Sequence, residues 1–123
     1  MLKDKMTLVI NSCDKFSDLW DEHVRILNEN WSDREVETLL VTDRPTDRKL
    51  ERVRIFSAGE GKEYPQRMAA VLPEIRTEYV LITLDDYFPI NKIYNDRLER
   101  LIGIMDAEGI DYLRLFSDPN SHK

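Results

Sequence analysis

The sequence predicts an α/β domain in which helices cover both faces of a mostly parallel sheet, giving three layers. Short apolar runs rich in β-branched residues recur along the chain, and stretches with apolar residues at three- and four-residue spacing separate them. Strands that alternate with helices form parallel sheets, because each strand needs a crossover connection to the next. We expect residues 1–123 to form one domain, since domains commonly have about 100–150 residues.

The first expected strand covers residues 6–12, a short apolar run after a charged start. A helix should follow, with Ser17 as its N-cap and acidic residues in its first turn. Its apolar side chains recur at helical spacing and would lie on the sheet: Phe16, Trp20, Val24, Leu27 and Trp31. Residues 36–42 and 53–56 are the second and third expected strands. The polar stretch between them mixes both charges, which favours a solvated turn or short helix.

Residues 57–62 are expected to form a loop, with Pro65 as the first residue of the next helix. Pro73 should end or kink that helix, because proline lacks the N–H that a helix needs. The loop glycines, Gly59 and Gly61, lack the spacing of a dinucleotide fingerprint or a P-loop. The loop therefore predicts no phosphate site by itself.

Residues 79–84 are the strongest buried-strand signal in the chain. A long helix is expected next, with Gly109 at its end. Its apolar face would contain Tyr94, Leu98, Leu101, Ile102 and Met105. Residues 111–116 are the fifth expected strand. Right-handed crossovers then favour the strand order 3-2-1-4-5.

The composition excludes several classes of protein. With 18 basic and 24 acidic residues the net charge is −6, so the chain carries no overall electrostatic footprint for nucleic acid. It has no apolar run long enough to span a bilayer and no N-terminal signal sequence. Cys13 is the only cysteine, which excludes an internal disulfide, and no Cys/His spacing resembles a zinc site. We expect a cytoplasmic protein.

In a parallel sheet, ligands bind beyond the carboxyl ends of the strands. The polar residues at those positions are Asp14, Asp43, the loop 57–62 and the adjacent pair Asp85 and Asp86. Two neighbouring carboxylates repel one another, and a divalent cation such as Mg²⁺ or Mn²⁺ would compensate them and bridge to a diphosphate. The pair is equally compatible with a solvated turn in which one Asp caps the next helix. A response-regulator receiver domain is excluded, because its acidic pair follows the first strand.

Other candidate residues favour structural roles. His23 has no second His or Cys near it in sequence, and one histidine makes neither a metal site nor a triad. Cys13 is better explained as a small buried side chain than as a nucleophile. Trp20 and Trp31 are expected in the core. For Tyr87 and Phe88, directly after the acidic pair, core packing and a place in a ligand cleft are both open.

Four segments in succession resemble a known family. They are residues 7–14 (TLVINSCD), residues 39–43 (LLVTD), residues 64–70 (YPQRMAA) after a glycine-containing loop, and residues 79–88 (YVLITLDDYF). Over residues 7–116 the chain is similar to nucleotide-sugar glycosyltransferases of the GT-A fold, most of all to the bacterial group of capsule and lipopolysaccharide biosynthesis. The resemblance implies a Rossmann-like, GT-A-like sheet and a nucleotide-diphosphosugar donor as ligand.

The resemblance also implies a role for each matching residue. Asp85 and Asp86 match the acidic motif that holds the divalent cation, Mn²⁺ or Mg²⁺, and Asp85 would also contact the donor. The segment Ser12, Cys13 and Asp14 matches the loop that faces the nucleoside, and Asp43 matches the acidic position near the base. Arg67 matches a helix position that faces the diphosphate, for which a guanidinium fork is well suited.

Two features depart from the family pattern. The family motif is Asp-any-Asp, whereas here the acids are adjacent and Tyr87 holds the third place. Family members also continue for well over a hundred further residues, which carry the acceptor site. We therefore expect a donor-binding half that is incomplete and inactive as an enzyme on its own. The alternative is a non-catalytic α/β interaction module. Its exposed sheet edge would favour a homo-oligomer.

Overall fold

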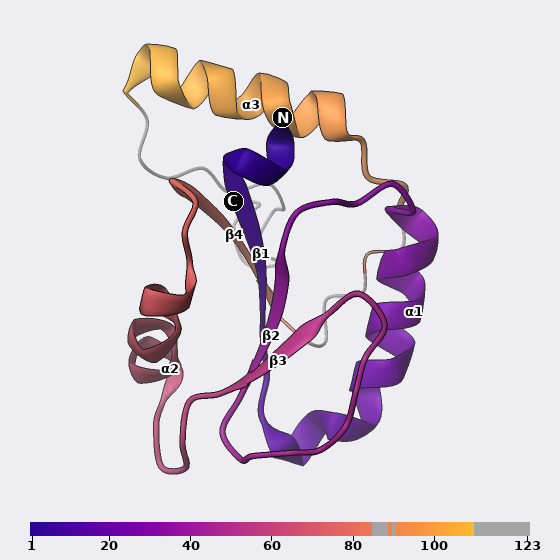
Figure 1. Ribbon diagram of the computed structural model, residues 1–123, viewed down its shortest axis with the longest axis vertical. Helices are drawn as coiled ribbons and strands as arrows, with labels where there is room; N and C mark the ends of the chain where they lie inside the picture. Colours follow the sequence, from indigo (N-terminus) through magenta and orange to yellow (C-terminus); the bar gives the residue numbers. More distant parts are fainter. Residues whose placement is uncertain (85–88, 90, 110–123) are drawn as a thin grey trace, which may run out of the picture.

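The computed structural model describes residues 1–84, 89 and 91–109, and over these a helix separates each strand from the next except between the second and third strands, which a loop connects (Figure 1). The strands are β1 (Met6–Asn11), β2 (Thr38–Thr42), β3 (Arg54–Ser57) and β4 (Tyr79–Leu84). The α-helices are α1 (Trp20–Asn30), α2 (Tyr64–Val71) and α3 (Asn95–Glu108). Short 3-10 helices are η1 (Leu2–Asp4), η2 (Asp14–Leu19) and η3 (Leu72–Glu74). None of the described helices combines the length and apolar character needed to cross a membrane.

The four described strands form one all-parallel sheet in the order β3-β2-β1-β4. The α/β class with a parallel sheet is therefore confirmed. In register, Asn11 at the end of β1 lies opposite Val41 of β2 and Leu84 of β4. The carboxyl ends of these strands thus meet at the same edge of the sheet. The expected fifth strand, 111–116, lies outside the described residues, so the five-strand order stays a prediction.

The two central strands are buried along their whole length, and their side chains belong to two separate clusters. On one face, side chains of β1 and β2 pack with α1 and α3; the cluster includes Leu8, Ile10, Leu40, Trp20, Leu27, Leu98 and Ile102. On the other face they pack with α2; this cluster includes Val9, Leu39, Val41 and Val71. Alternate residues of one strand point to opposite faces, which is why two separate clusters form.

The first helical region differs from the prediction. Ser17 does not cap a helix: it lies inside η2, and α1 begins at Trp20 with Leu19 as its N-cap. Phe16 has a non-helical backbone conformation, which kinks η2 itself, so a 3-10 segment with a kink stands before α1. Apolar spacing does not reveal such a break, because a 3-10 turn and an α-turn place side chains in similar directions. The prediction that Trp20 and Trp31 belong to the core is confirmed.

The second helix begins and ends close to the expected positions. Glu63 is the N-cap of α2, so Pro65 is the second helical residue instead of the first. The helix ends at Val71, and Pro73 lies in the 3-10 turn that follows, as its missing N–H predicts. At the end of α3, Gly109 has a φ of 69° and closes the helix in the left-handed conformation, which confirms the expected stop.

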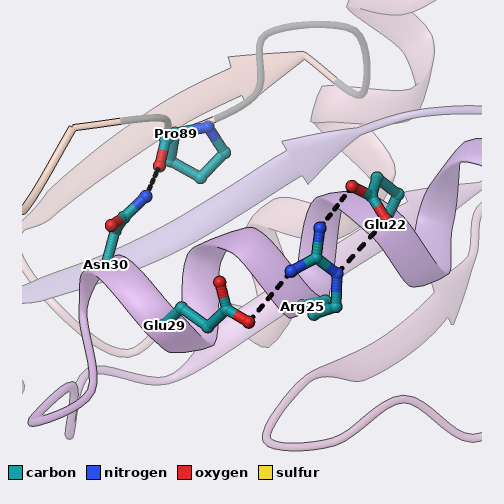
Figure 2. Close-up of polar contacts among 5 residues, drawn as sticks. All are labelled: Glu22, Arg25, Glu29, Asn30 and Pro89. Carbon is teal, nitrogen blue, oxygen red and sulfur yellow. Dashed lines mark hydrogen bonds and ion pairs between the residues drawn. The ribbon is translucent and has the colours of Figure 1, made fainter.

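Two residues before α3, Pro89 and Ile93, are hydrogen-bonded to Asn30 at the end of α1, and Figure 2 shows the first of these contacts. The side-chain amide of Asn30 donates to the carbonyl of Pro89 at 2.5 Å, and the N–H of Ile93 donates to the carbonyl of Asn30 at 2.8 Å. The indole N–H of Trp31 donates to Asn95 Oδ1 at 2.6 Å, which ties the first residue of α3 to the same place. Helix α3 consequently lies near the amino ends of the strands, leaving the opposite edge to the loops (Figure 1).

Candidate functional site

The loops after β1, β2 and β3 meet at the carboxyl edge of the sheet, the edge at which the parallel strands end. Ser12 follows β1 and is buried: its N–H donates to Val41 O at 2.8 Å, and its hydroxyl accepts the indole N–H of Trp20 at 2.8 Å. Cys13 and Asp14 come next and are half-buried. The buried tryptophan therefore fixes the start of the loop that carries them.

Asp43 connects all three loops. Its Oδ1 accepts the N–H of Asp14 at 2.8 Å, the N–H of Arg44 at 3.0 Å and the hydroxyl of Thr42 at 3.3 Å. Its main-chain carbonyl accepts the N–H of Gly59 at 3.1 Å. One residue at the end of β2 thereby links the loop after β1 to the loop after β3.

These contacts lower the pKa of the Asp43 carboxyl. The N–H of Asp14 is the largest cause, and partial burial acts in the opposite direction. The main-chain N–H groups of Asp43 and Arg44 and the Thr42 hydroxyl add to the lowering. Hydrogen bonds to the charged form stabilise it, which is why the pKa of this carboxyl is lowered despite the partial burial.

Charged side chains lie around this link. Arg44 Nε lies 2.6 Å from Glu60 Oε1, and its Nη1 lies 4.0 Å from Asp14 Oδ2. Arg44 and Glu60 are well exposed and the Asp14 side chain is 43% exposed, so the ion pairs contribute little stability. They nevertheless join the loops after β1, β2 and β3 a second time.

Arg67 reaches the same edge from α2. Its Nε donates to Asn11 Oδ1 at 3.3 Å, at the end of β1, and its Nη1 donates to the carbonyl of Lys62 at 2.7 Å. The ammonium group of Lys62 donates to the carbonyl of Ala58 at 2.5 Å. Both cations therefore donate to neutral oxygens, and neither forms an ion pair within the described part of the chain.

The structure thus brings most of the predicted site residues together at one edge: Ser12, Cys13, Asp14, Asp43 and Arg67. Asp85 and Asp86 lie outside the described residues. The last residue of β4, Leu84, pairs with Asn11, so β4 ends at this same edge. In the ranges 1–84, 89 and 91–109, no group of three or more His, Cys, Asp or Glu side chains is arranged to hold a metal ion.

Sequence reasoning missed three residues of this edge: Asn11, Arg44 and Lys62. Asn11 was placed inside the first strand, and Arg44 was assigned to a solvated turn of mixed charge. Lys62 was inside the predicted loop 57–62, but no motif distinguished it. The usable signal was the position of each residue within one or two places of a strand end or a helix start.

An open groove of about 470 Å³ lies elsewhere, between α1 and residues 49–52. Among its lining side chains are Asp21, Arg25, Glu29, Lys49 and Arg52. Acidic and basic side chains both line it, and none of the predicted site residues does. Ligand pockets are mostly apolar with a few convergent polar groups, so the carboxyl edge is the better candidate site.

Comparisons with protein-family models, with curated proteins and with solved structures each gave no match to this chain. The functional argument therefore rests on the geometry of the carboxyl edge and on the residues that form it.

Proposed function

We propose that the carboxyl edge of the sheet binds the nucleotide-diphosphate part of a sugar donor, and that the chain is the donor-binding part of a GT-A-type glycosyltransferase. The observation that carries the proposal is the convergence of the loops after β1, β2 and β3 through Asp43. Arg67 adds a guanidinium at this edge that no described carboxylate neutralises. Ligands of parallel α/β sheets bind at such an edge.

The proposal includes a divalent cation, Mn²⁺ or Mg²⁺, on Asp85 and Asp86. The described carboxylates do not fit a cation by themselves, because Asp43 Oδ1 is already used by N–H donors and no third ligand is arranged beside Asp14. A bound cation would act as a Lewis acid on the diphosphate. In the described part of the site, Asp43 orders the loops and Arg67 provides positive charge.

The same proposal includes the detailed architecture of the domain, which has three αβα layers and a five-stranded sheet in the order 3-2-1-4-5. It is supported by the outer side of β4, which pairs with no other strand among the described residues. The segment 111–116 would pair there. Hydrogen–deuterium exchange should then show slowed exchange in 111–116 together with β4, whereas fast exchange throughout 111–116 would contradict a fifth strand.

The test of donor binding is a calorimetric titration of the chain with uridine and guanosine diphosphates, with and without Mn²⁺. We expect weak binding that Mn²⁺ strengthens, and we expect Asp85→Asn and Asp86→Asn to lose this metal-dependent part of the binding. Glu108→Gln, which removes a carboxylate at the far end of α3, is the matched control and should bind as the wild type does. Absence of heat with every nucleotide would reject the donor-site proposal.

We expect little or no sugar transfer by this chain alone. The cytoplasmic location expected from the sequence belongs to the same proposal. Sugar transfer at an appreciable rate, lost in Asp86→Asn, would contradict the expected inactivity while supporting donor binding.

A second candidate function is a non-catalytic interaction module that self-associates through β4. It is favoured by the exposure of Ile82, an apolar residue in the middle of this strand that is 45% exposed. An unpaired strand edge readily accepts a strand from another chain. Light scattering should then give a dimer mass that Ile82→Lys converts to a monomer mass. A monomer at high concentration, or metal-dependent nucleotide binding, would favour the first candidate.

A further inference from the structure

The carboxyl edge carries two cations that the described protein does not neutralise, Lys62 and Arg67. On α1, by contrast, Arg25 pairs with Glu22 and Glu29 (Figure 2). Lys62 and Arg67 instead donate only to carbonyl and amide oxygens. These bonds orient the two side chains and leave their positive charges available.

The described carboxylates near these cations have other partners. Asp43 accepts main-chain N–H groups from two loops. Glu60 is paired with Arg44 at 2.6 Å. Glu63 is the N-cap of α2 and takes part in a capping box with Gln66, whose Oε1 accepts the Glu63 N–H at 2.8 Å. Because the Glu63 carboxylate already accepts a main-chain N–H in the first turn of α2, that turn does not itself receive an anion.

The two cations belong to one local unit. Arg67 Nη1 donates to the main-chain carbonyl of Lys62, and the Lys62 side chain folds back over the loop to the carbonyl of Ala58. Gly59 has a φ of 102°, and a Cβ built there would lie 3.5 Å from Lys62 Nζ. Arg67 Nη2 makes no hydrogen bond to the described residues, so the guanidinium keeps a donor for a ligand.

From this geometry we propose that Lys62 and Arg67 form a diphosphate-binding pair that acts independently of a metal ion. Arginine supplies a planar fork that matches phosphate oxygens, and lysine supplies a compact point charge. The inference rests on the proposed donor site and makes it more specific: part of the charge of the diphosphate is compensated by protein cations. Lys62 is then a binding residue that neither the sequence nor the resemblance assigned.

The experiment is a titration of the full chain with inorganic pyrophosphate in the presence of a chelator, which removes divalent cations. We expect binding to weaken by about tenfold or more in Lys62→Met and in Arg67→Met, because each loses a charge-assisted hydrogen bond. Arg67→Lys keeps the charge but loses the fork and should give an intermediate loss. Lys5→Met, an exposed lysine before β1 at the opposite edge, should bind as the wild type does.

Three outcomes would overturn the inference: no binding of pyrophosphate without metal, binding that survives both methionine variants, or an equal loss in Lys5→Met. Circular dichroism of each variant checks the fold; should Arg67→Met fail to fold, Lys62→Met and Arg67→Lys decide.

A parallel titration with the nucleoside diphosphates and Mn²⁺ separates the two proposals. Nucleotide binding that requires Asp86 but is unaffected by Lys62→Met and Arg67→Met would retain the donor site and reject the cation pair. Pyrophosphate binding that depends on the pair, without any nucleotide binding, would retain the pair and reject the donor site.

Discussion

Each edge of the sheet has an arginine that pairs with no carboxylate among the described residues, and the two differ in their access to solvent. Arg34 lies at the amino edge, just before β2, and is only 5% exposed. Its Nε donates to Thr38 Oγ1 at 2.9 Å and its Nη2 to Arg52 O at 3.1 Å, while its Nη1 is buried without a partner. Arg67, at the carboxyl edge, is half-buried.

The difference shows when an unpaired guanidinium indicates a ligand site. Burial lowers the pKa of Arg34 to about 10, and the nearby positive charge of Arg52 acts in the same direction. Because its unused nitrogen is enclosed by protein, Arg34 acts on the fold by joining β2 to the turn before β3. Arg67 has similar neutral partners, but its unused nitrogen belongs to a side chain that solvent reaches. Solvent access to the unused guanidinium nitrogen therefore distinguishes the structural Arg34 from the proposed binding residue Arg67.

The largest expected effect is on stability, and it tests whether Arg34 and Arg67 have different roles. We expect Arg34→Ala to lower the free energy of unfolding by about 2–4 kcal/mol. The substitution leaves a cavity and removes the N–H groups that donate to Thr38 Oγ1 and to Arg52 O. Arg67→Ala should cost less than about 1 kcal/mol, since its partners can bind water instead. Urea unfolding of the two variants measures both values. Equal losses would mean that both arginines are structural.

Gly59 tests whether the backbone of the carboxyl edge is as constrained as its contacts indicate. At a φ of 102° an alanine is strained, so Gly59→Ala should cost about 1–3 kcal/mol of unfolding free energy. Gly103, inside α3, is the control: nothing lies within 4 Å of its added Cβ, and Gly103→Ala should stabilise by about 0.5–1 kcal/mol. Thermal or urea unfolding gives the signs, and a neutral Gly59→Ala would contradict the described loop.

The smallest effect concerns Asp43 and depends on pH. Because its folded-state pKa is lowered, its ionised form stabilises the fold above the unfolded-state pKa of about 3.9, and this contribution is lost as the pH falls through the lower folded value. Asp43→Asn keeps an acceptor but loses the charge, so we expect a loss of about 1 kcal/mol at pH 7.

The difference between the wild type and Asp43→Asn should shrink below about pH 4, and urea unfolding at pH 7, 5 and 3 measures it. Asp47→Asn, which removes an exposed carboxyl without a described hydrogen bond, is the control. A difference between Asp43→Asn and the wild type that persists unchanged at pH 3 would show that the charge is not responsible.

The sequence predicted the parallel sheet because its signals are local: the apolar runs of β1, β2 and β4 each stand between polar segments. The same local signals placed Asp43 and Asp14 at the carboxyl edge. They did not reveal which groups these residues contact, because the decisive hydrogen bonds span large sequence distances, such as the separation of 56 positions from Asn11 to Arg67. Local patterns identify strand ends, but pairings between loops depend on the register of the sheet.

The two buried tryptophans provide a built-in optical readout of the two edges. Trp20 donates its indole N–H to Ser12 at the carboxyl edge, and Trp31 donates its own to Asn95 at the start of α3. Indole fluorescence responds to the loss of such a hydrogen bond and to the entry of water. In Trp31→Phe, emission would report the loop after β1, and in Trp20→Phe it would report the docking of α3. Ligand-induced changes seen only in Trp31→Phe would localise binding to the carboxyl edge without a label.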